Sequence, residues 1–484
     1  MEKAVLILDF GTSNVRAMLI AVADGRIAAK SSRKNQWLSG ENGQSEMDVL
    51  KLWETAQSCV EDIIGKDKEQ TDILGIGFSF FGDSLLPVDK EGNPLCNMLM
   101  AFDTRAQEEA AYLEQTIGKE KFREITGYRC LSMLCCSKIL WLKKNRPEVF
   151  KKAAFFLNIQ EFIFLKMGLG IKTDYTLAGR KTMMDIHKRK WSFELIQHTG
   201  TNVSQMGETV GESTEVAGYI SSFGRVKLPG KLPVIYGAHD CECGLLGLGV
   251  SPENKNIAAN VAGTYEVLST FSKNDIANIS GIAELGLGLG KNDMILNGSS
   301  IAGSYIKWFQ KEMSDDPEKM FGNMEKQVEY DGEGSLFFLM DNDIEKCILD
   351  GLTVRTTRSE IYQAMIEGIT FKLRELQEEL EKAKNSHFTH IMAGGGGSAS
   401  DKWLQLKADL LQKEVRRVEN MEVSAVGAAI ITAVGIGYYE SYEKAIEAMV
   451  KTERVFIPDS EVSQKYLKKF QMYKEKVKML KENL

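Results

Sequence analysis

Alternating apolar and polar runs divide the chain into two halves with the same order of elements. Two apolar runs within residues 4–22 flank the polar tip Gly11-Thr12-Ser13-Asn14, a pattern that predicts a β-hairpin. Residues 257–269 repeat this pattern with Gly263-Thr264 at the tip. A second hairpin with Gly-Thr at its turn predicts a structurally repeated domain rather than an unrelated second fold.

Helical periodicity is clearest over residues 48–65 and 359–384, where apolar side chains recur every three or four positions. Residues 107–167 are expected to be mainly helical, with helical pieces continuing to about residue 225. Within that region, the small and polar residues 173–179 predict a loop. The Lys/Glu-rich tail is expected to be a helix with an exposed face.

Two predicted strands end in residues that can carry chemistry. The apolar run 232–236 leads into Gly237-Ala238-His239-Asp240, and a buried strand that breaks at glycine can present a carboxylate at a cleft floor. For an isolated tetrad, a turn with a surface aspartate is the alternative. The strand at 388–393 leads into four glycines, Gly394 to Gly397, before a helix near Asp401. Such a turn lets backbone contact a flat or anionic ligand, and its position before a strong helix disfavours a flexible linker.

The first hairpin places Asp9 just before Gly11-Thr12-Ser13. Backbone N–H groups and hydroxyls at such a tip can cradle phosphate oxygens, while Asp9 can hold Mg²⁺ directly or through water. An ordinary polar hairpin is the alternative for an isolated match. Residues 102–105 are predicted to open a helix, with Asp103 either as its N-cap or as a ligand contact.

Composition and charge narrow the function classes. With 484 residues the chain is too long for one hydrophobic core, and its net charge of -7 argues against broad binding to nucleic acid or anionic lipid. No apolar run approaches the roughly 20 residues that span a membrane. The run at 4–8 meets Asp9 at once and predicts a strand rather than a signal peptide. Eight scattered cysteines indicate reduced thiols in a cytoplasmic protein rather than a zinc site.

The order of these motifs is more specific than any one of them. An Asp-Phe-Gly-Thr-Ser hairpin, a central Gly-x-His-Asp, a second Gly-Thr hairpin and Gly-Gly-Gly-Gly-Ser-x-Ser-x-x-Trp-x-Gln-x-x-Ala-Asp follow one another. This series resembles the FGGY carbohydrate kinases of the actin/hexokinase/Hsp70 superfamily, over Leu6 to about Ile457. The resemblance implies an α/β protein with two ribonuclease-H-like (actin-like ATPase) domains and a cleft between them. It places a sugar-binding domain at 1–246, an ATP-binding domain at 247–460 and a C-terminal helical tail at 461–484.

The resemblance also implies roles for individual residues. Asp240 matches the general base, and Asp9 together with Asp240 matches the pair that holds Mg²⁺–ATP. The implied ATP-binding residues are Gly11, Thr12, Ser13, Gly263, Thr264, Gly395, Gly396 and Ser398. The implied sugar-binding residues are Asp83, Asp103, Arg105, His239 and Asp240. His239 is expected either to contact the sugar or to pack.

The resemblance therefore implies ATP-dependent phosphorylation of a hydroxyl on a ketose, deoxy-ketose or polyol, with ATP and Mg²⁺ as cofactors. An apolar Phe81-Gly82 and a missing Gly-Glu-Arg-x-Pro element depart from the family pattern and leave the sugar open. His239 resembles the deoxy-ketose kinases of the family. A non-catalytic or polymerising nucleotide-binding relative is the alternative function. The oligomeric state stays open, with a homodimer as one alternative.

Overall fold

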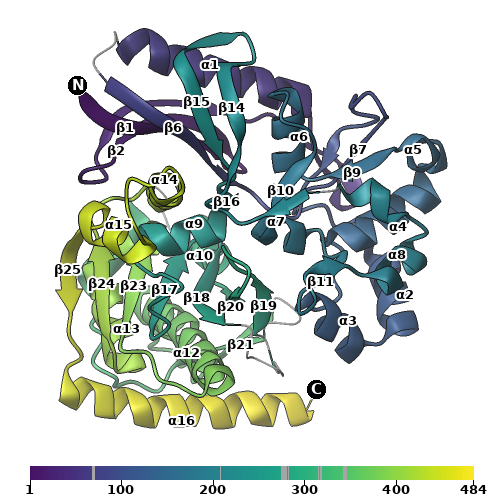
Figure 1. The fold of residues 1–484 in the computed structure, drawn as a ribbon. Helices are drawn as coiled ribbons and strands as arrows, with labels where there is room; N and C mark the ends of the chain where they lie inside the picture. The colour runs from purple at the N-terminus through teal and green to yellow at the C-terminus, as the bar shows by residue number, and fades with distance from the viewer. Residues whose placement is uncertain are drawn as a thin grey trace.

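Two seven-stranded sheets form the cores of two α/β domains in the computed structural model, which describes residues 1–67, 71–207, 209–273, 281, 283–313, 316, 319–341 and 346–483 (Figure 1). In order across the first sheet lie β14 (Val216–Phe223), β15 (Val226–Ile235), β6 (Thr71–Phe80), β1 (Glu2–Phe10), β2 (Asn14–Ala21) and β3 (Ile27–Lys34), and β16 (Ala238–His239) also pairs with β6. The second sheet has the order β19 (Glu284–Leu287), β20 (Asp293–Ile301), β18 (Tyr265–Lys273), β17 (Ile257–Ala262), β23 (His390–Gly394), β24 (Glu414–Val418) and β25 (Thr452–Phe456).

The two sheets share one pairing pattern. In the first sheet, β1 pairs antiparallel with β2 and parallel with β6. In the second sheet, β17 pairs antiparallel with β18 and parallel with β23. In chain order, each sheet therefore starts with an antiparallel hairpin whose first strand also pairs with a later parallel strand. This shared arrangement confirms the predicted structural repeat. In both domains the hairpin turn lies beside the carboxyl end of the next parallel strand, where α/β sheets usually bind ligands.

Helices cover both sheets. In the first domain α1 (Val49–Asp67) packs on β2 and β3. In the second domain α12 (Arg358–Lys384) packs on β18 and β20, and α13 (Asp401–Leu411) packs on β24. The remaining elements of the second domain are α10 (Gly303–Met313), α11 (Met320–Gln327), β21 (Phe337–Asp341), β22 (Lys346–Asp350), α15 (Tyr442–Met449) and α16 (Ser460–Asn483).

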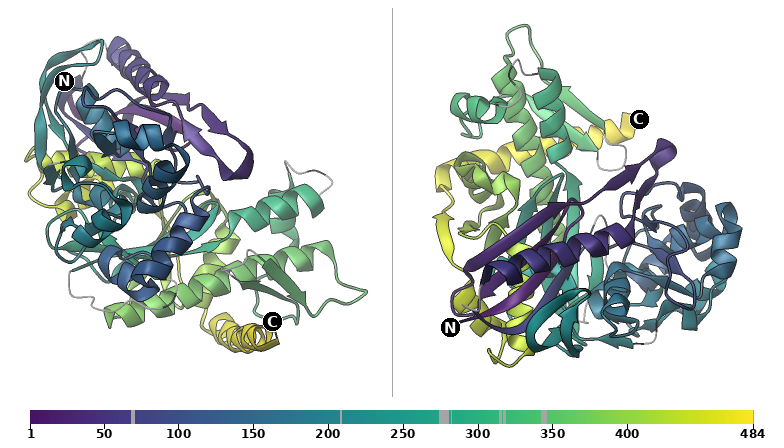
Figure 2. Two further views of the ribbon diagram at one scale, coloured as in Figure 1. Left: turned by 90° about the vertical axis from the view of Figure 1, so that its right-hand side faces the viewer. Right: turned by 90° about the horizontal axis from the view of Figure 1, so that it is seen from above.

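A helical lobe extends the first domain and lies to one side of its sheet (Figure 2). Its buried residues include Leu113, Phe122, Ile139 and Leu195, which form a hydrophobic cluster of their own. The helices of the lobe are α2 (Gln107–Ile117), α3 (Lys119–Thr126), α4 (Cys135–Asn145), α5 (Pro147–Lys152) and α8 (Phe193–Thr199). The domain's other two helices, α6 (Ile159–Lys166) and α7 (Tyr175–Arg180), contribute side chains to the core of the first sheet. The short strands of the domain are β4 (Trp37–Ser39), β5 (Ser45–Met47), β7 (Leu86–Val88), β8 (Met98–Leu99), β9 (Phe155–Leu157), β10 (Lys172–Asp174), β11 (Met184–Asp185), β12 (Lys190–Trp191) and β13 (Thr209–Gly211).

Three local predictions were wrong. The expected loop at 173–179 is β10 followed by α7, because the Asp174 side chain accepts hydrogen bonds from the backbone of Thr176 and Leu177 and caps the helix. The expected helix before residue 225 is the strand β14, whose exposed positions reflect its place at the sheet edge. Asp103 is no N-cap, since α2 begins at Gln107. The tail helix α16 has the expected exposed face, and its other face buries Tyr466, Phe470 and Tyr473 against the second domain. Leu484 lies outside the described residues.

All eight cysteines are free thiols, in agreement with the sequence. Among the described residues, no helix is both long enough and apolar enough to cross a lipid bilayer.

Two small-residue helices join the domains. Helix α9 (Asp240–Gly247) leaves the first sheet, and α14 (Val423–Gly435) of the second domain packs against it and against β1 and β6. A β-carbon added at Gly427 would lie 1.7 Å from the carbonyl oxygen of Cys243, and one added at Gly247 would lie 1.8 Å from that of Val423. The glycines therefore let the two helix backbones touch.

We expect Gly427→Ala to destabilise this junction, because α14 must move away from α9 to make room for the methyl group. Overpacking of this kind costs about 1–3 kcal/mol, measurable as a lower midpoint of urea unfolding. Gly65→Ala in α1 is the matched control, since a β-carbon at that helical glycine meets no atom within 4 Å. An unchanged midpoint for Gly427→Ala would show that the helices can separate freely.

Candidate active site

The register of three neighbouring strands brings the two predicted acidic residues together. Asp9 on β1 lies opposite Ser79 on β6, and Ser79 in turn lies opposite Ala238 on β16. Asp240 follows β16 and begins α9. The two carboxylates are close enough that the charge of Asp240 contributes to raising the pKa of Asp9. The structure therefore sets both acids at the carboxyl ends of two parallel strands, β1 and β16, that both pair with β6.

Asp9 is 4% exposed and lies beside one cation. Arg16 Nη1 on β2 donates to its Oδ2 at 2.8 Å, and Arg16 Nε lies 3.7 Å from Glu422 of the second domain. Burial raises the pKa of the Asp9 carboxyl, and the Arg16 charge opposes this without cancelling it. Arg16 therefore holds the Asp9 carboxylate in place where the two domains meet.

Asp240 is bonded to a buried histidine. His239 Nε2 lies 3.2 Å from Asp240 Oδ1, and His239 Nδ1 lies 2.6 Å from Glu242 Oε2. Burial lowers the pKa of His239, but the Glu242 and Asp240 carboxylates outweigh it and the pKa is raised. The pKa of Asp240 is also raised, chiefly by burial. His239 is only 6% exposed, so it packs and orients Asp240 at the same time.

Asp83 directly follows Gly82, which lies beside His239, and pairs with an arginine that the sequence did not single out. Arg180, the last residue of α7, forms a short ion pair with Asp83 Oδ2. A β-carbon at Gly82 would lie 2.6 Å from His239 Nε2 and 3.3 Å from Arg180 Nε, so both nitrogens line the same side of Gly82. The positive charge of Arg180 also opposes the rise in the pKa of Asp240. Asp83, Arg180, His239 and Asp240 therefore form one cluster.

The second domain contributes a carboxylate to this cluster. Glu284 on β19 has its pKa raised by burial, and Arg180 and Arg129 oppose the shift. Backbone contacts fix this approach, because Leu285 N–H donates to the carbonyl oxygen of Gly127 at 3.1 Å. The guanidinium of Arg180 also stacks 4.8 Å from the centre of the Tyr128 ring. Residues of both domains thus meet at the site.

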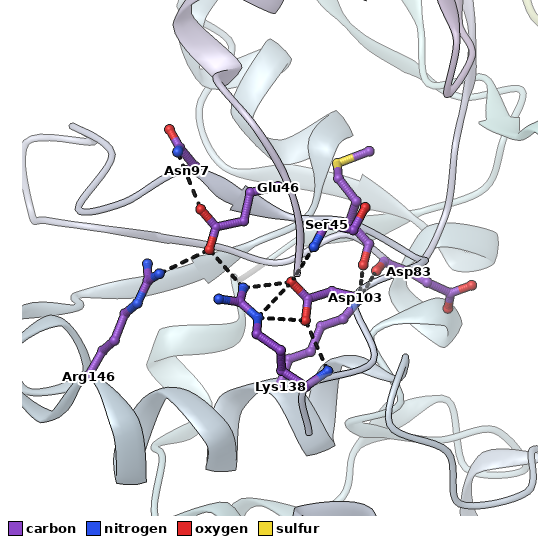
Figure 3. A network of polar contacts seen from close by, with 9 residues as sticks. Ser45, Glu46, Asp83, Asn97, Asp103, Lys138 and Arg146 are labelled. Atoms are coloured by element: carbon purple, nitrogen blue, oxygen red, sulfur yellow. Dashed lines mark hydrogen bonds and ion pairs between the residues drawn. The ribbon is translucent and has the colours of Figure 1, made fainter. Parts of the chain in front are cut away.

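Asp103 and Arg105 lie in a second, neighbouring network (Figure 3). Arg105 Nη2 donates to Asp103 Oδ2 at 2.6 Å and to Glu46 Oε1 at 2.7 Å, and Asp103 accepts from the backbone of Ser45. Lys138 Nζ links the network to the site by donating to the carbonyl oxygens of Asp83 and Met100 at 2.7 and 2.6 Å. Both oxygens of Asp103 accept bonds from within the chain, so a sugar contact by Asp103 stays a prediction.

The two predicted phosphate turns lie at the hairpin tips of the two sheets. Gly11, Thr12 and Ser13 connect β1 to β2. The side chains of Asn35 and Trp37 both donate hydrogen bonds to the carbonyl oxygen of Thr12. Gly263 and Thr264 connect β17 to β18 and are exposed. The N-terminus of α10 supports this second turn, because Gly303 N–H donates to the carbonyl oxygen of Gly263 at 3.1 Å.

The glycine-rich turn lies next to Gly263-Thr264, because β23 pairs with β17 and Gly394 lies opposite Val261. A β-carbon at Gly395 would lie 2.5 Å from the carbonyl oxygen of Ala262, whereas one at Gly396 would meet no atom within 4 Å. Ser398 is buried and its hydroxyl donates to the carbonyl oxygen of Gly395 at 2.7 Å. Gly395 and Ser398 therefore shape the turn, whereas no neighbouring atom crowds the backbone of Gly396.

The donor set at the strand ends suits Mg²⁺. Asp9 and Asp240 supply two carboxylates, the hard oxygen ligands that Mg²⁺ prefers, and the charge of Asp240 contributes to raising the pKa of Asp9. His239, Asp240 and Cys241 also lie close enough to share an ion, with donor atoms within 4.8 Å of one another. Both ring nitrogens of His239 already face carboxylates, so this softer set is a poorer metal site.

Family models match both halves of the chain. The N-terminal domain of the FGGY family of carbohydrate kinases matches residues 4–247, and its C-terminal domain matches residues 259–436. The chain belongs to the FGGY family of carbohydrate kinases. The enzyme is therefore a phosphotransferase, and its family supports ATP-dependent phosphorylation of a sugar or polyol.

Relatives of this FGGY kinase span its full length. It is 28% identical to the xylulose kinase of Bacillus subtilis (strain 168), over 98% of this chain and 96% of the relative, and 28% identical to the L-fuculokinase of Escherichia coli (strain K12), over 95% and 98%. Among solved structures, the gluconate kinase of Lactobacillus acidophilus superposes with a TM-score of 0.90 at 21% identity, covering 99% of this chain and 98% of that one. At that identity the likeness shows the fold, which confirms two actin-like domains.

Three site residues were missed from the sequence. Glu242 follows Asp240 by two positions, but no motif in the sequence marks it. Arg180 directly follows the stretch 173–179 that was expected to be a loop, and Glu284 precedes a Gly-Leu alternation typical of a strand. Only the packing of β19 and α7 brings the last two close to Asp240.

Proposed function

We propose that this FGGY kinase phosphorylates a hydroxyl of a ketose, deoxy-ketose or polyol with ATP, and that Asp240 is the general base. The observation that carries the proposal is the strand register that brings Asp240 beside Asp9. A binding protein would need no second carboxylate at this position. A non-catalytic or polymerising relative of the superfamily is therefore the weaker alternative.

The chemistry follows from the position of Asp240. A sugar hydroxyl is a poor nucleophile, and a carboxylate within hydrogen-bonding reach can accept its proton while the O–P bond forms. His239 engages Oδ1 of Asp240, which leaves Oδ2 for that proton. Because the side chain of Asp240 is 33% exposed, a bound sugar can reach it. Asp83 and Arg180 lie on the adjoining side of Gly82 and would orient the sugar.

ATP would lie against the two hairpin turns and the glycine-rich turn. Gly11, Thr12 and Ser13 offer backbone and hydroxyl groups from the first domain. Gly263, Thr264, Gly395 and Gly396 offer backbone from the second, and Ser398 holds the last turn in shape. Mg²⁺ bound by Asp9 and Asp240 would neutralise phosphate charge. This division assigns the sugar to residues 1–246 and most of the nucleotide to 247–460, with 461–484 as a helical tail.

A coupled assay for ADP tests the proposal. We expect one class among ketoses, deoxy-ketoses and pentitols to stimulate Mg²⁺-dependent ADP release at least tenfold over ATP alone, and EDTA to abolish the stimulation. Light scattering with ATP is measured in parallel. If no sugar stimulates turnover, and ATP instead drives assembly, the polymerising alternative replaces this proposal.

A further inference from the structure

The segment after β3 holds the carbonyl oxygens of the first hairpin turn, Gly11-Thr12-Ser13. Asn35 Nδ2 donates to the carbonyl oxygens of Gly11 at 2.8 Å and of Thr12 at 3.1 Å. Trp37 Nε1 donates to the same oxygen of Thr12 at 2.8 Å. The backbone N–H of Asn35 donates to the carbonyl oxygen of Ser13 at 2.9 Å. One short segment therefore binds all three carbonyl oxygens of the turn.

These bonds also set the direction of the amide hydrogens in the turn. A trans peptide group is planar, so its carbonyl oxygen and the N–H of the next residue point in opposite directions. Because the oxygens of Gly11 and Thr12 are bound to the Asn35 side chain, the N–H groups of Thr12 and Ser13 point away from it. Among the described residues, neither N–H has an acceptor. Successive free N–H groups of this kind can bind an anionic oxygen.

The second hairpin turn has the same two carbonyl groups bound, but by a different segment. The carbonyl oxygen of Gly263 accepts from Gly303 N–H at 3.1 Å, and that of Thr264 accepts from Ala302 N–H at 3.2 Å. In the structural repeat, this Gly-Thr pair corresponds to Gly11-Thr12. The second domain thus uses backbone at the start of α10 where the first domain uses two side chains. Two unrelated segments that make equivalent bonds indicate a requirement of the turn itself.

The amide of Asn35 is not explained by stability alone. Its Oδ1 is buried and has no hydrogen-bond partner in the part of the chain that the structure describes. A buried polar atom without a partner costs free energy, which an apolar side chain of similar size would avoid. Only an NH₂ group, however, can donate to two carbonyl oxygens at once. The value of Asn35 therefore lies in what Nδ2 does to the turn.

The place of the turn indicates which phosphate it would face. The turn directly follows β1, which carries Asp9, and it belongs to the domain that carries Asp240. In the proposed function the sugar binds this domain and most of the nucleotide binds the other one. The terminal phosphoryl group of ATP is then the part that approaches the first domain. Oriented N–H donors stabilise the charge on this group during transfer.

We propose that Asn35 and Trp37 are positioning residues for phosphoryl transfer, which hold the carbonyl oxygens of the first turn so that its N–H groups face the terminal phosphoryl group of ATP. The inference rests on the proposed function and deepens it. It assigns the orientation of the turn to two side chains that lie outside the turn and need not touch ATP or the sugar.

Asn35→Leu tests this role, because leucine keeps the size of the side chain and removes both donors. We expect kcat with the best sugar of the panel to fall about 10–100-fold, since misaligned N–H groups stabilise the transition state less. The KM for the sugar and the affinity for ADP should change by less than about twofold, because the contacts of both lie elsewhere. Gln36→Leu, at the exposed neighbouring amide, is the matched control and should keep full turnover.

Trp37→Phe is a milder second variant. It removes Nε1–H but keeps an aromatic ring beside Phe102, whose ring centre lies 6.1 Å from that of Trp37. Because Thr12 keeps its bond from Asn35, kcat should fall only about 2–5-fold. This variant keeps the test decisive if the leucine variant does not fold, which thermal melting shows.

Calorimetry with ADP and with a non-hydrolysable ATP analogue distinguishes positioning from a purely structural role. We expect the Asn35→Leu variant to bind ADP as the unmodified enzyme does and to bind the analogue more weakly. Full turnover in both folded variants, or an equal loss of affinity for ADP and for the analogue, overturns this inference while the kinase proposal stands. If no sugar stimulates turnover in the unmodified enzyme, both proposals fail.

Discussion

Replacing Asp240 with alanine should lower kcat by about 10²–10⁴-fold, the contribution typical of a general base. The variant loses the group that accepts the hydroxyl proton, while the turns proposed to bind ATP lie on other elements. We therefore expect ATP affinity, measured by calorimetry without sugar, to change less than the turnover does. Because Asp240 is also proposed to hold Mg²⁺, the calorimetry is run both with and without the metal.

Two further variants distinguish the loss of the general base from other effects of a substitution. Asp240→Asn keeps the shape and one oxygen but cannot take a proton, so its turnover should fall as far as that of the alanine variant. Asp24→Asn is the matched control, because this aspartate lies in the turn after β2, at the opposite end of that strand from Gly11–Ser13. Turnover near the unmodified level in Asp240→Asn would show that another group takes the proton.

The sequence predicted the parts of the site that belong to strand ends. Each hairpin was visible because apolar runs flank a polar tip, and the structure confirms both, with Asp9 on β1 and Gly263-Thr264 between β17 and β18. That Asp9 and Asp240 lie near each other depends on β6 lying between β1 and β16. No local pattern states that order, so only the series of motifs and the family resemblance indicated the proximity.

Residues that act across the fold could not be found in this way. Arg180 stands after a stretch whose small and polar residues indicate a loop, and the capping carboxylate of Asp174 that makes it a helix is itself buried. Asp103 shows the converse error. It precedes a helix and looks like a cap, but Arg105 two residues later pairs with it and fixes a turn instead. In both cases the partner of a side chain decides its role.

Lys407 of α13 is a charged residue of a type that is usually exposed. Its side chain is instead 1% exposed, and Nζ donates to Glu266 Oε1 at 2.6 Å and to Asn260 Oδ1 at 2.7 Å. Asn260 on β17 and Glu266 on β18 flank the Gly263-Thr264 turn. The ammonium therefore ties α13 to both strands of the proposed phosphate hairpin from within the core.

We expect Lys407→Met to lower the free energy of unfolding by about 3–5 kcal/mol, because the buried Glu266 carboxylate, itself 0% exposed, is left without its cation. Urea unfolding followed by circular dichroism measures the loss. The double variant Lys407→Met/Glu266→Leu removes both charges and should recover most of that stability, since an apolar pair of similar volume avoids the cost of desolvating ions. Equal losses in the single and double variants would contradict this account, because they would trace the cost to packing rather than to the unpaired charge.

In the double variant the KM for ATP should still rise, since the hairpin loses the bonds that fix its turn.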